Sequence, residues 1–203
     1  MKNSRTMSYL GIFLCGILFN IIIIIGNVIG ECDFECQEEC LVYHNKYRMN
    51  HNVTMLRFDP MLAIQAQHWA DNGVLDTSNW GKTGEGGECW AWGNIFPSWK
   101  TVVKTWHDQE RHFDWDEYKP VDNQKVGCFQ QVVWAGATKI GCGMSLIKGL
   151  PFYVAQMDVA GVFKKEDMMN GLTNIKKPLM PDLHWFKDEQ QCDSCQSSST
   201  KAF

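Results

Sequence analysis

The stretch VGCFQQVVWAGATKIGCGMSLIKGLPFYVAQMDVA, residues 126–160, decides the fold. Its first part, CFQQVVWAGA at 128–137, is a short apolar run that predicts a helix. KIGCGMSLI at 139–147 and FYVAQMDVA at 152–160 have the composition and length of buried strands. Lys148-Gly149-Leu150-Pro151 lies between them, so the stretch predicts a helix followed by a β-hairpin.

Three helices are expected before this stretch. The first covers residues 31–50, and the second follows Asp59, which has the N-cap position ahead of Pro60 at the first helical position. A third begins near Ser98. Its expected stripe, at helical spacing, consists of Trp99, Val102, Val103, Trp106, Glu110 and Phe113. Residues 76–88 are rich in glycine and polar residues and are expected to form a loop, as are residues 116–125. Helices combined with a hairpin predict an α+β fold.

Residues 1–30 resemble a secretory signal peptide. Two basic residues precede a long apolar run at 10–25, and Gly30 offers a small residue for cleavage. The alternative is an uncleaved membrane anchor, because residues 7–29 are nearly long enough to span a bilayer. We expect cleavage, since no second apolar span follows. The remaining chain divides into one domain at 31–163 and a polar C-terminal extension at 164–203, which carries a CxxC pair.

Cleavage after Gly30 would change the formal charge from −4 to −6, because it removes Lys2 and Arg5 and no acidic residue. An acidic product without basic clusters is not expected to bind nucleic acid or an anionic membrane surface. Asn52-Val53-Thr54 is a sequon that predicts glycosylation of Asn52 in an exported chain.

The exported chain would keep eight cysteines, an even number that favours disulfides. Besides Cys128, the candidates are Cys32, Cys36, Cys40, Cys89, Cys142, Cys192 and Cys195. The two cysteine groups near the termini lack the spacing of a zinc knuckle, so we expect disulfides that tie the termini to the core. Cys128 follows a glycine and precedes a helix, where a reactive thiol could be displayed. We expect it to form a disulfide instead, with Cys89 or Cys142 as the candidate partner.

Six sequence blocks occur in an order that resembles one known family. They are HNKYR (44–48), LRFDPMLAIQAQHWAD (56–71), GECWAW (87–92), FQQVVW (129–134), IGCGMSL (140–146) and FYVAQMDVAG (152–161). Together they resemble the CAP superfamily of cysteine-rich secretory, antigen 5 and pathogenesis-related 1 proteins, including venom allergen-like proteins. The resemblance covers residues 36–163. It implies an α-β-α sandwich, in which a small, mostly antiparallel sheet lies between helices.

The family's best-known site is a tetrad of two histidines and two glutamates that can hold a divalent metal. The resemblance places its four positions on Thr77, Glu88, Gln109 and Cys128, so only Glu88 keeps the family residue. Zinc needs three or four good donors, and threonine and glutamine are poor ones. Glu110 lies about 100° around a helix from Gln109 and does not replace it. We therefore expect no tetrad metal and no cofactor.

The same resemblance bears on the cysteines and histidines. In plant relatives the cysteine that matches Cys142 bonds to a cysteine just before the glutamate that matches Glu88. Here Cys89 lies just after Glu88, so the resemblance makes a shifted Cys89–Cys142 bond plausible, which would leave Cys128 unpaired. The choice of partner stays open. His44 and Arg48 match a structural block of the family. The other five histidines are expected at the surface, and residues 106–118 could form a weak metal patch or simply a solvated helix end.

These observations predict a secreted, disulfide-stabilised CAP protein without enzymatic activity, which binds a lipid, a sterol or a protein partner. The alternative is a metal- or thiol-dependent hydrolase that uses Cys128 and Glu88. After signal cleavage no membrane attachment is expected.

Overall fold

The computed structural model describes residues 31–161 and 174–180. The helices are α2 (Phe34–Asn50), α3 (Pro60–Asp71), α4 (Asn79–Thr83), α5 (Trp99–His107) and α6 (Gly127–Val133), with 3-10 turns η1 (Asp108–His112) and η2 (Val121–Asn123). The strands are β1 (Arg57–Phe58), β2 (Gly87–Trp92), β3 (Phe113–Asp114), β4 (Lys119–Pro120), β5 (Lys139–Ile147) and β6 (Leu150–Met157). No helix among these residues is both long and apolar enough to cross a membrane.

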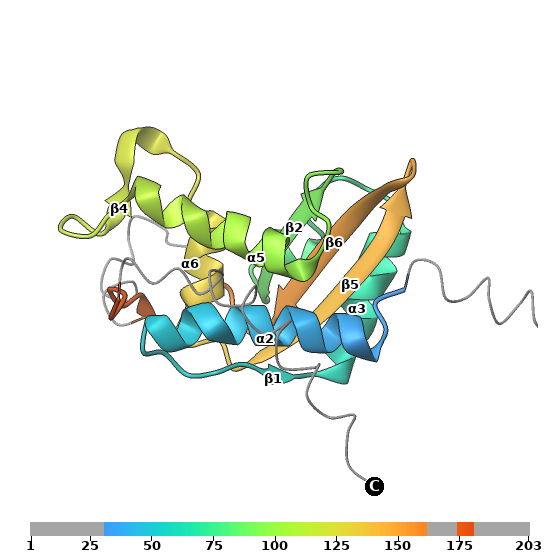
Figure 1. The fold of residues 1–203 in the computed structure, drawn as a ribbon, viewed down its shortest axis with the longest axis horizontal. Helices are drawn as coiled ribbons and strands as arrows, with labels where there is room; N and C mark the ends of the chain where they lie inside the picture. Colours follow the sequence, from blue (N-terminus) through green and yellow to red (C-terminus); the bar gives the residue numbers. More distant parts are fainter. Residues whose placement is uncertain (1–30, 162–173, 181–203) are drawn as a thin grey trace, which may run out of the picture.

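The main sheet has the strand order β1-β5-β6-β2. β5 pairs with β6 and β6 with β2 in antiparallel register, whereas the short β1 runs parallel to β5. Figure 1 shows α3 on one face of this sheet and α2, α5 and α6 on the other. The predicted α-β-α sandwich with a mostly antiparallel sheet is therefore confirmed.

The β5–β6 hairpin closes with two residues, Lys148 and Gly149, and not with the four expected. Both have positive φ, at 53° and 76°, the geometry of a type I′ turn. This turn matches the right-handed twist of the two strands, so Leu150 and Pro151 already belong to β6.

Two other segments differ from the sequence-based expectation. The predicted loop at 76–88 contains α4, which follows Ser78 and is capped at its C-terminal end by Gly84 in the left-handed conformation, with φ 75°. The last two residues of the predicted loop, Gly87 and Glu88, belong to β2. Short polar helices of this kind carry too few apolar residues for periodicity to reveal them. The third helix ends at His107 and continues as η1, while the expected loop at 116–125 contains β4 and η2.

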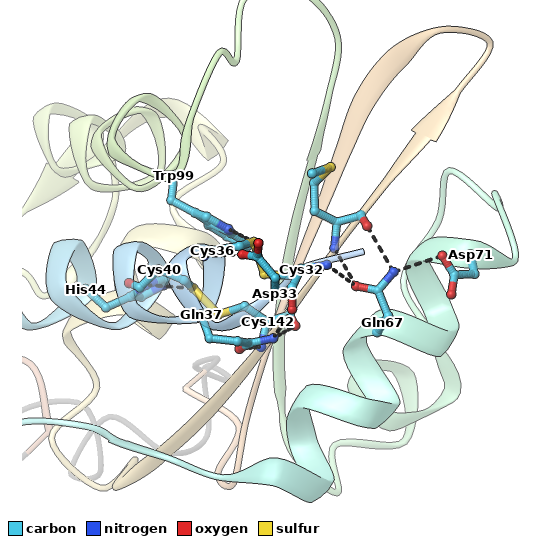
Figure 2. Close-up of a disulfide and its surroundings, with 11 residues drawn as sticks. Cys32, Asp33, Cys36, Gln37, Cys40, His44, Gln67, Asp71, Trp99 and Cys142 are labelled. Carbon is cyan, nitrogen blue, oxygen red and sulfur yellow. Dashed lines mark hydrogen bonds between the residues drawn. A yellow bond between two sulfur atoms is a disulfide. The ribbon is translucent and has the colours of Figure 1, made fainter. Parts of the chain in front are cut away.

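Three disulfides connect the described cysteines: Cys32–Cys36, Cys40–Cys142 and Cys89–Cys128. Cys40–Cys142 fastens α2 to β5 (Figure 2). The implied Cys89–Cys142 bond is wrong, because both cysteines lie opposite Ala155 on the two sides of β6. Two strand spacings separate them by about 10 Å, beyond the roughly 7 Å reach of a disulfide. Cys192 and Cys195 lie outside the described residues.

Candidate functional site

The four positions that match the family's metal tetrad all have internal partners. Thr77 Oγ1 accepts a hydrogen bond from Trp90 Nε1 at 3.4 Å, and Gln109 Oε1 accepts one from the Phe129 amide at 3.2 Å. Cys128 is bonded to Cys89.

Glu88 is the one tetrad position that keeps the family residue, and its carboxylate accepts three hydrogen bonds. It accepts hydrogen bonds from the Ser78 amide at 2.7 Å, from the Ser78 hydroxyl, and from Gln156 Nε2 at 2.8 Å. Neighbouring side chains on a strand point to opposite faces of the sheet. Since Cys89 bonds to Cys128 from one face of β2, Glu88 points to the other face. The structure does not bring Glu88 and Cys128 together.

A groove of about 640 Å³ lies between the N-terminal half of α2 and α3. Its lining is mainly apolar and comes from two segments, residues 31–41 and 58–67. Three of its large apolar side chains are exposed: Phe34 at 80%, Ile64 at 62% and Phe58 at 49%. An exposed apolar surface of this kind marks a binding site more often than an isolated apolar residue does.

Two glutamines fix the floor of this groove to β5. Gln67 Oε1 accepts from the amides of Cys32 at 2.9 Å and Met144 at 3.1 Å, and its Nε2 donates to the Met144 carbonyl. Gln37 exchanges hydrogen bonds with the backbone of Cys142. Figure 2 shows these side chains converging on β5 from α2 and α3, beside the Cys40–Cys142 disulfide. The two helices that border the groove are thus fixed to β5 by covalent and polar contacts as well as by apolar packing.

His44 and Arg48 are buried in the core, as a structural role requires. The Arg48 guanidinium donates to carbonyl oxygens at 2.7–3.0 Å, belonging to Thr54, Val132, Trp134 and Ala137. Three of these bonds join the C-terminal end of α2 to the end of α6 and the segment after it, and the bond to Thr54 fixes the loop that follows α2.

A third cluster combines His51, His107 and Glu110, which come from the end of α2, the end of α5 and η1. Ligand atoms of the three side chains lie within 4.8 Å of one another. Burial lowers the pKa of His107 to about 3 and also lowers that of His51, whereas burial raises the pKa of Glu110 to about 7. Both imidazoles are therefore neutral at neutral pH.

The sequence placed His51 and His107 at the surface, and that prediction is wrong: His51 is fully buried and His107 is 9% exposed. His51 lies beyond the last residue of α2, and the turn there directs it against the end of α5. The sequence feature that could have indicated this cluster was the mixture of acidic residues, histidines and aromatic residues at 106–118.

Comparison with known proteins places this geometry in context. The family model described as CAP, the cysteine-rich secretory protein family, matches residues 41–157. The chain is 29% identical over 120 residues to cysteine-rich secretory protein 3 of Equus caballus, covering 55% of this chain and 49% of that protein. It is 30% identical over 107 residues to pathogenesis-related protein 1A of Nicotiana tabacum, covering 52% and 64%. The chain thus spans about half to two thirds of the length of these relatives.

Solved structures agree on the fold. Venom allergen-like protein 4 of Schistosoma mansoni superposes with a TM-score of 0.54 at 18% identity, covering 67% of this chain and 99% of that chain. A structure of NaASP2 with Zn²⁺ gives 0.53 at 15% identity, covering 72% and 87%. At these identities the likeness concerns the arrangement of helices and strands.

Proposed function

Because the chain belongs to the CAP family of cysteine-rich secretory proteins, we propose that it is a secreted, non-enzymatic protein that binds a lipid in the groove between α2 and α3. Members of this family are generally not classical enzymes, and the family as a whole binds lipids or proteins. In this proposal residues 31–163 form the working domain, and the observation that carries it is the exposed apolar lining of the groove.

The residues at the tetrad positions do not fit a metal. Zinc needs three or four good donors, and of the four positions only the Glu88 carboxylate offers one. That carboxylate already accepts hydrogen bonds from Ser78 and Gln156. Cys128 is consumed by its disulfide, and the Gln109 carbonyl oxygen accepts from Phe129. We infer that the family's metal site has been lost here.

The same contacts argue against the hydrolase alternative. A thiol nucleophile must ionise, and a cysteine in a disulfide has no thiol to ionise. Glu88, the intended base, points to the opposite face of β2 from Cys128. Neither a thiol-dependent nor a tetrad-metal mechanism has the groups it needs among these residues.

Charge around the groove narrows the class of lipid. Three carboxylates lie in the lining, on Glu31, Asp33 and Glu38, and no lysine, arginine or histidine accompanies them. The amino group that cleavage after Gly30 would free leaves this rim net acidic. A fatty-acid carboxylate would be repelled at such a rim, so we expect an uncharged lipid of the sterol type.

The disulfides and the glycosylation sequon at Asn52 both support the proposal that the protein is exported. Disulfides persist in oxidising compartments, and this chain has three of them within the described residues. Asn52 is exposed just beyond the C-terminal end of α2. The helix has 17 residues and is therefore about 25 Å long. A glycan on Asn52 would lie far from the groove, which adjoins the other end.

The test compares two matched variants of the secreted protein. Ile64→Glu places a carboxylate inside the groove. Ile95→Glu places one at a similarly exposed isoleucine in the loop before α5, at 69% exposure against 62% for Ile64. We expect a fluorescent sterol to bind the parent chain and Ile95→Glu alike, and Ile64→Glu at least tenfold more weakly.

A fluorescent fatty acid, measured in parallel, should bind more weakly than the sterol. Equal sterol affinity in the two variants, or no sterol binding by the parent chain, would contradict the proposal.

A further inference from the structure

We propose that His51, His107 and Glu110 form a zinc-binding site that is separate from the four positions of the family tetrad. The three residues lie at the C-terminal ends of α2 and α5 and in η1, whereas the groove adjoins the N-terminal half of α2. The inference is therefore independent of the proposed lipid function.

Two of the three separations between the proposed ligand atoms are close to those of a tetrahedral site. His51 Nε2 lies 2.9 Å from His107 Nε2, and His107 Nε2 lies 3.5 Å from Glu110 Oε2. Ligand atoms about 2.0–2.1 Å from a tetrahedral zinc lie roughly 3.3 Å apart. The third separation, between the ligand atoms of His51 and Glu110, is at most 4.8 Å. A rotation of the Glu110 side chain toward His51 would bring the three atoms around one ion.

Each proposed ligand is oriented by a second contact. His51 Nδ1 lies 2.6 Å from the carbonyl oxygen of Lys176 and must donate to it, which leaves the Nε2 lone pair directed at the cluster. The ring of His107 stacks on Tyr47, with centroids 4.1 Å apart. Glu110 accepts a hydrogen bond from Trp115. Metal ligands are characteristically held by such outer contacts.

A hydrogen bond between His51 and His107 accounts for less of this arrangement than a bound divalent cation does. If His107 Nε2 donates to His51 Nε2, its single proton is used. The Glu110 carboxyl, 3.5 Å from His107 Nε2, then has its hydrogen bond from Trp115 but no donor from either imidazole. A divalent cation would accept lone pairs from all three side chains and would offset the partial burial of the carboxylate. Two imidazoles and one carboxylate favour zinc over calcium or magnesium, which prefer oxygen ligands.

Zinc at this position would connect α2, α5 and η1, and through His51 it would also act on residues 174–180. Residues 174–180 run beside the C-terminal end of α2 (Figure 1). Lys176 contacts His51, and Leu179 and Met180 bond to Asn50. The ion would hold the ends of α2 and α5 together and fix the imidazole on which this segment rests.

The test is calorimetric titration of Zn²⁺ into the full exported chain after removal of metals with EDTA. We expect one zinc per chain. Glu110→Gln keeps the shape of a partly exposed side chain and should fold. Because it removes a ligand, it should weaken binding by at least the roughly 10–100-fold that loss of an outer-shell contact costs. His107→Gln should do the same.

Two controls keep the result specific. His68→Gln changes an exposed histidine of α3 and should leave the affinity unchanged. A chain with Cys192→Ser and Cys195→Ser should also bind zinc normally, which excludes the CxxC pair as the site. Co²⁺ should give a visible absorption band in the parent chain that Glu110→Gln lacks. Absence of stoichiometric zinc binding, or equal affinity in Glu110→Gln, would overturn the inference.

Discussion

His44 shows how one buried polar residue links this core to pH. It is fully buried, and its Nδ1 lies 2.8 Å from the Cys40 carbonyl, to which it must donate. Its Nε2 has no hydrogen-bond partner among the described residues and lies beside the rings of Trp99 and Trp106. Desolvation lowers the pKa of His44 from 6.5 to about 4. The neutral imidazole is thus the form that the folded protein accepts.

Because the folded pKa of His44 lies below the unfolded value, acid should destabilise the fold through this residue. The contribution of neutral His44 to the free energy of unfolding is fully present above pH 6.5. It is lost as pH falls toward 4, since only the unfolded chain takes up the proton in that window. The slope is about 1.4 kcal/mol per pH unit. We expect His44→Phe to lose this dependence.

The measurement is urea unfolding of the parent chain and His44→Phe at several pH values between 4.5 and 7.5. The difference between their free energies of unfolding should be constant above pH 6.5 and change by about 1.4 kcal/mol per unit below it. Parallel curves over the whole range would contradict the assignment.

At the residue scale, sequence patterns predicted local features well and side-chain environments poorly. The N-cap role of Asp59 is confirmed, since its carboxylate accepts from the amides of Met61 and Leu62. A cap depends only on neighbouring residues. The burial of His51 and His107 depends on how the ends of two helices meet, which no local pattern contains.

At the scale of elements, the contact between β5 and α3 depends on two glycines. A Cβ on Gly141 would lie 1.9 Å from the Ala63 amide nitrogen, and one on Gly143 would lie 2.4 Å from the Ala66 carbonyl. Cys142 between them points to the other face, where it bonds to Cys40. The GCG sequence therefore lets a helix lie directly on one face of the strand while a disulfide fastens the other.

Gly143→Ala should displace α3 from the sheet. The new methyl group meets backbone, which cannot move aside as a flexible side chain can, so we expect a loss of about 3 kcal/mol or more in the free energy of unfolding. Gly127→Ala is the matched control, because a Cβ there meets nothing within 4 Å. It should be neutral or slightly stabilising. Thermal unfolding of both variants checks this, and similar melting temperatures would contradict the close-packing account.

Element type was predictable where periodicity was strong, and element order in the sheet was not. The hairpin, the helix after Asp59 and the helix after Ser98 follow from spacing and caps. The disulfide partner of Cys128 required knowing that β6 lies between β2 and β5, because that order keeps Cys89 and Cys142 apart. Strand order is set by long-range packing, which a single sequence does not display.

At the scale of the whole molecule, the described disulfides differ greatly in the length of chain they close. Cys40–Cys142 joins residues 102 apart, and Cys32–Cys36 joins residues only 4 apart. A disulfide restricts the unfolded chain more when its loop is longer, by about 4.7 kcal/mol for a loop of roughly 100 residues and about 2 kcal/mol for one of a few residues.

Replacing Cys40 and Cys142 together with alanine should therefore lower the free energy of unfolding by about 2–3 kcal/mol more than replacing Cys32 and Cys36.

The long-range bond also holds the N-terminal half of α2 against β5, so its loss should weaken sterol binding in the groove beyond the loss of stability. The short bond lies at the groove itself, because Cys32 is one of the lining residues. Removing it should weaken sterol binding and lower the free energy of unfolding by only about 2 kcal/mol. Urea unfolding and sterol titration of the two double variants separate these effects, and equal destabilisation by both would contradict a loop-length origin.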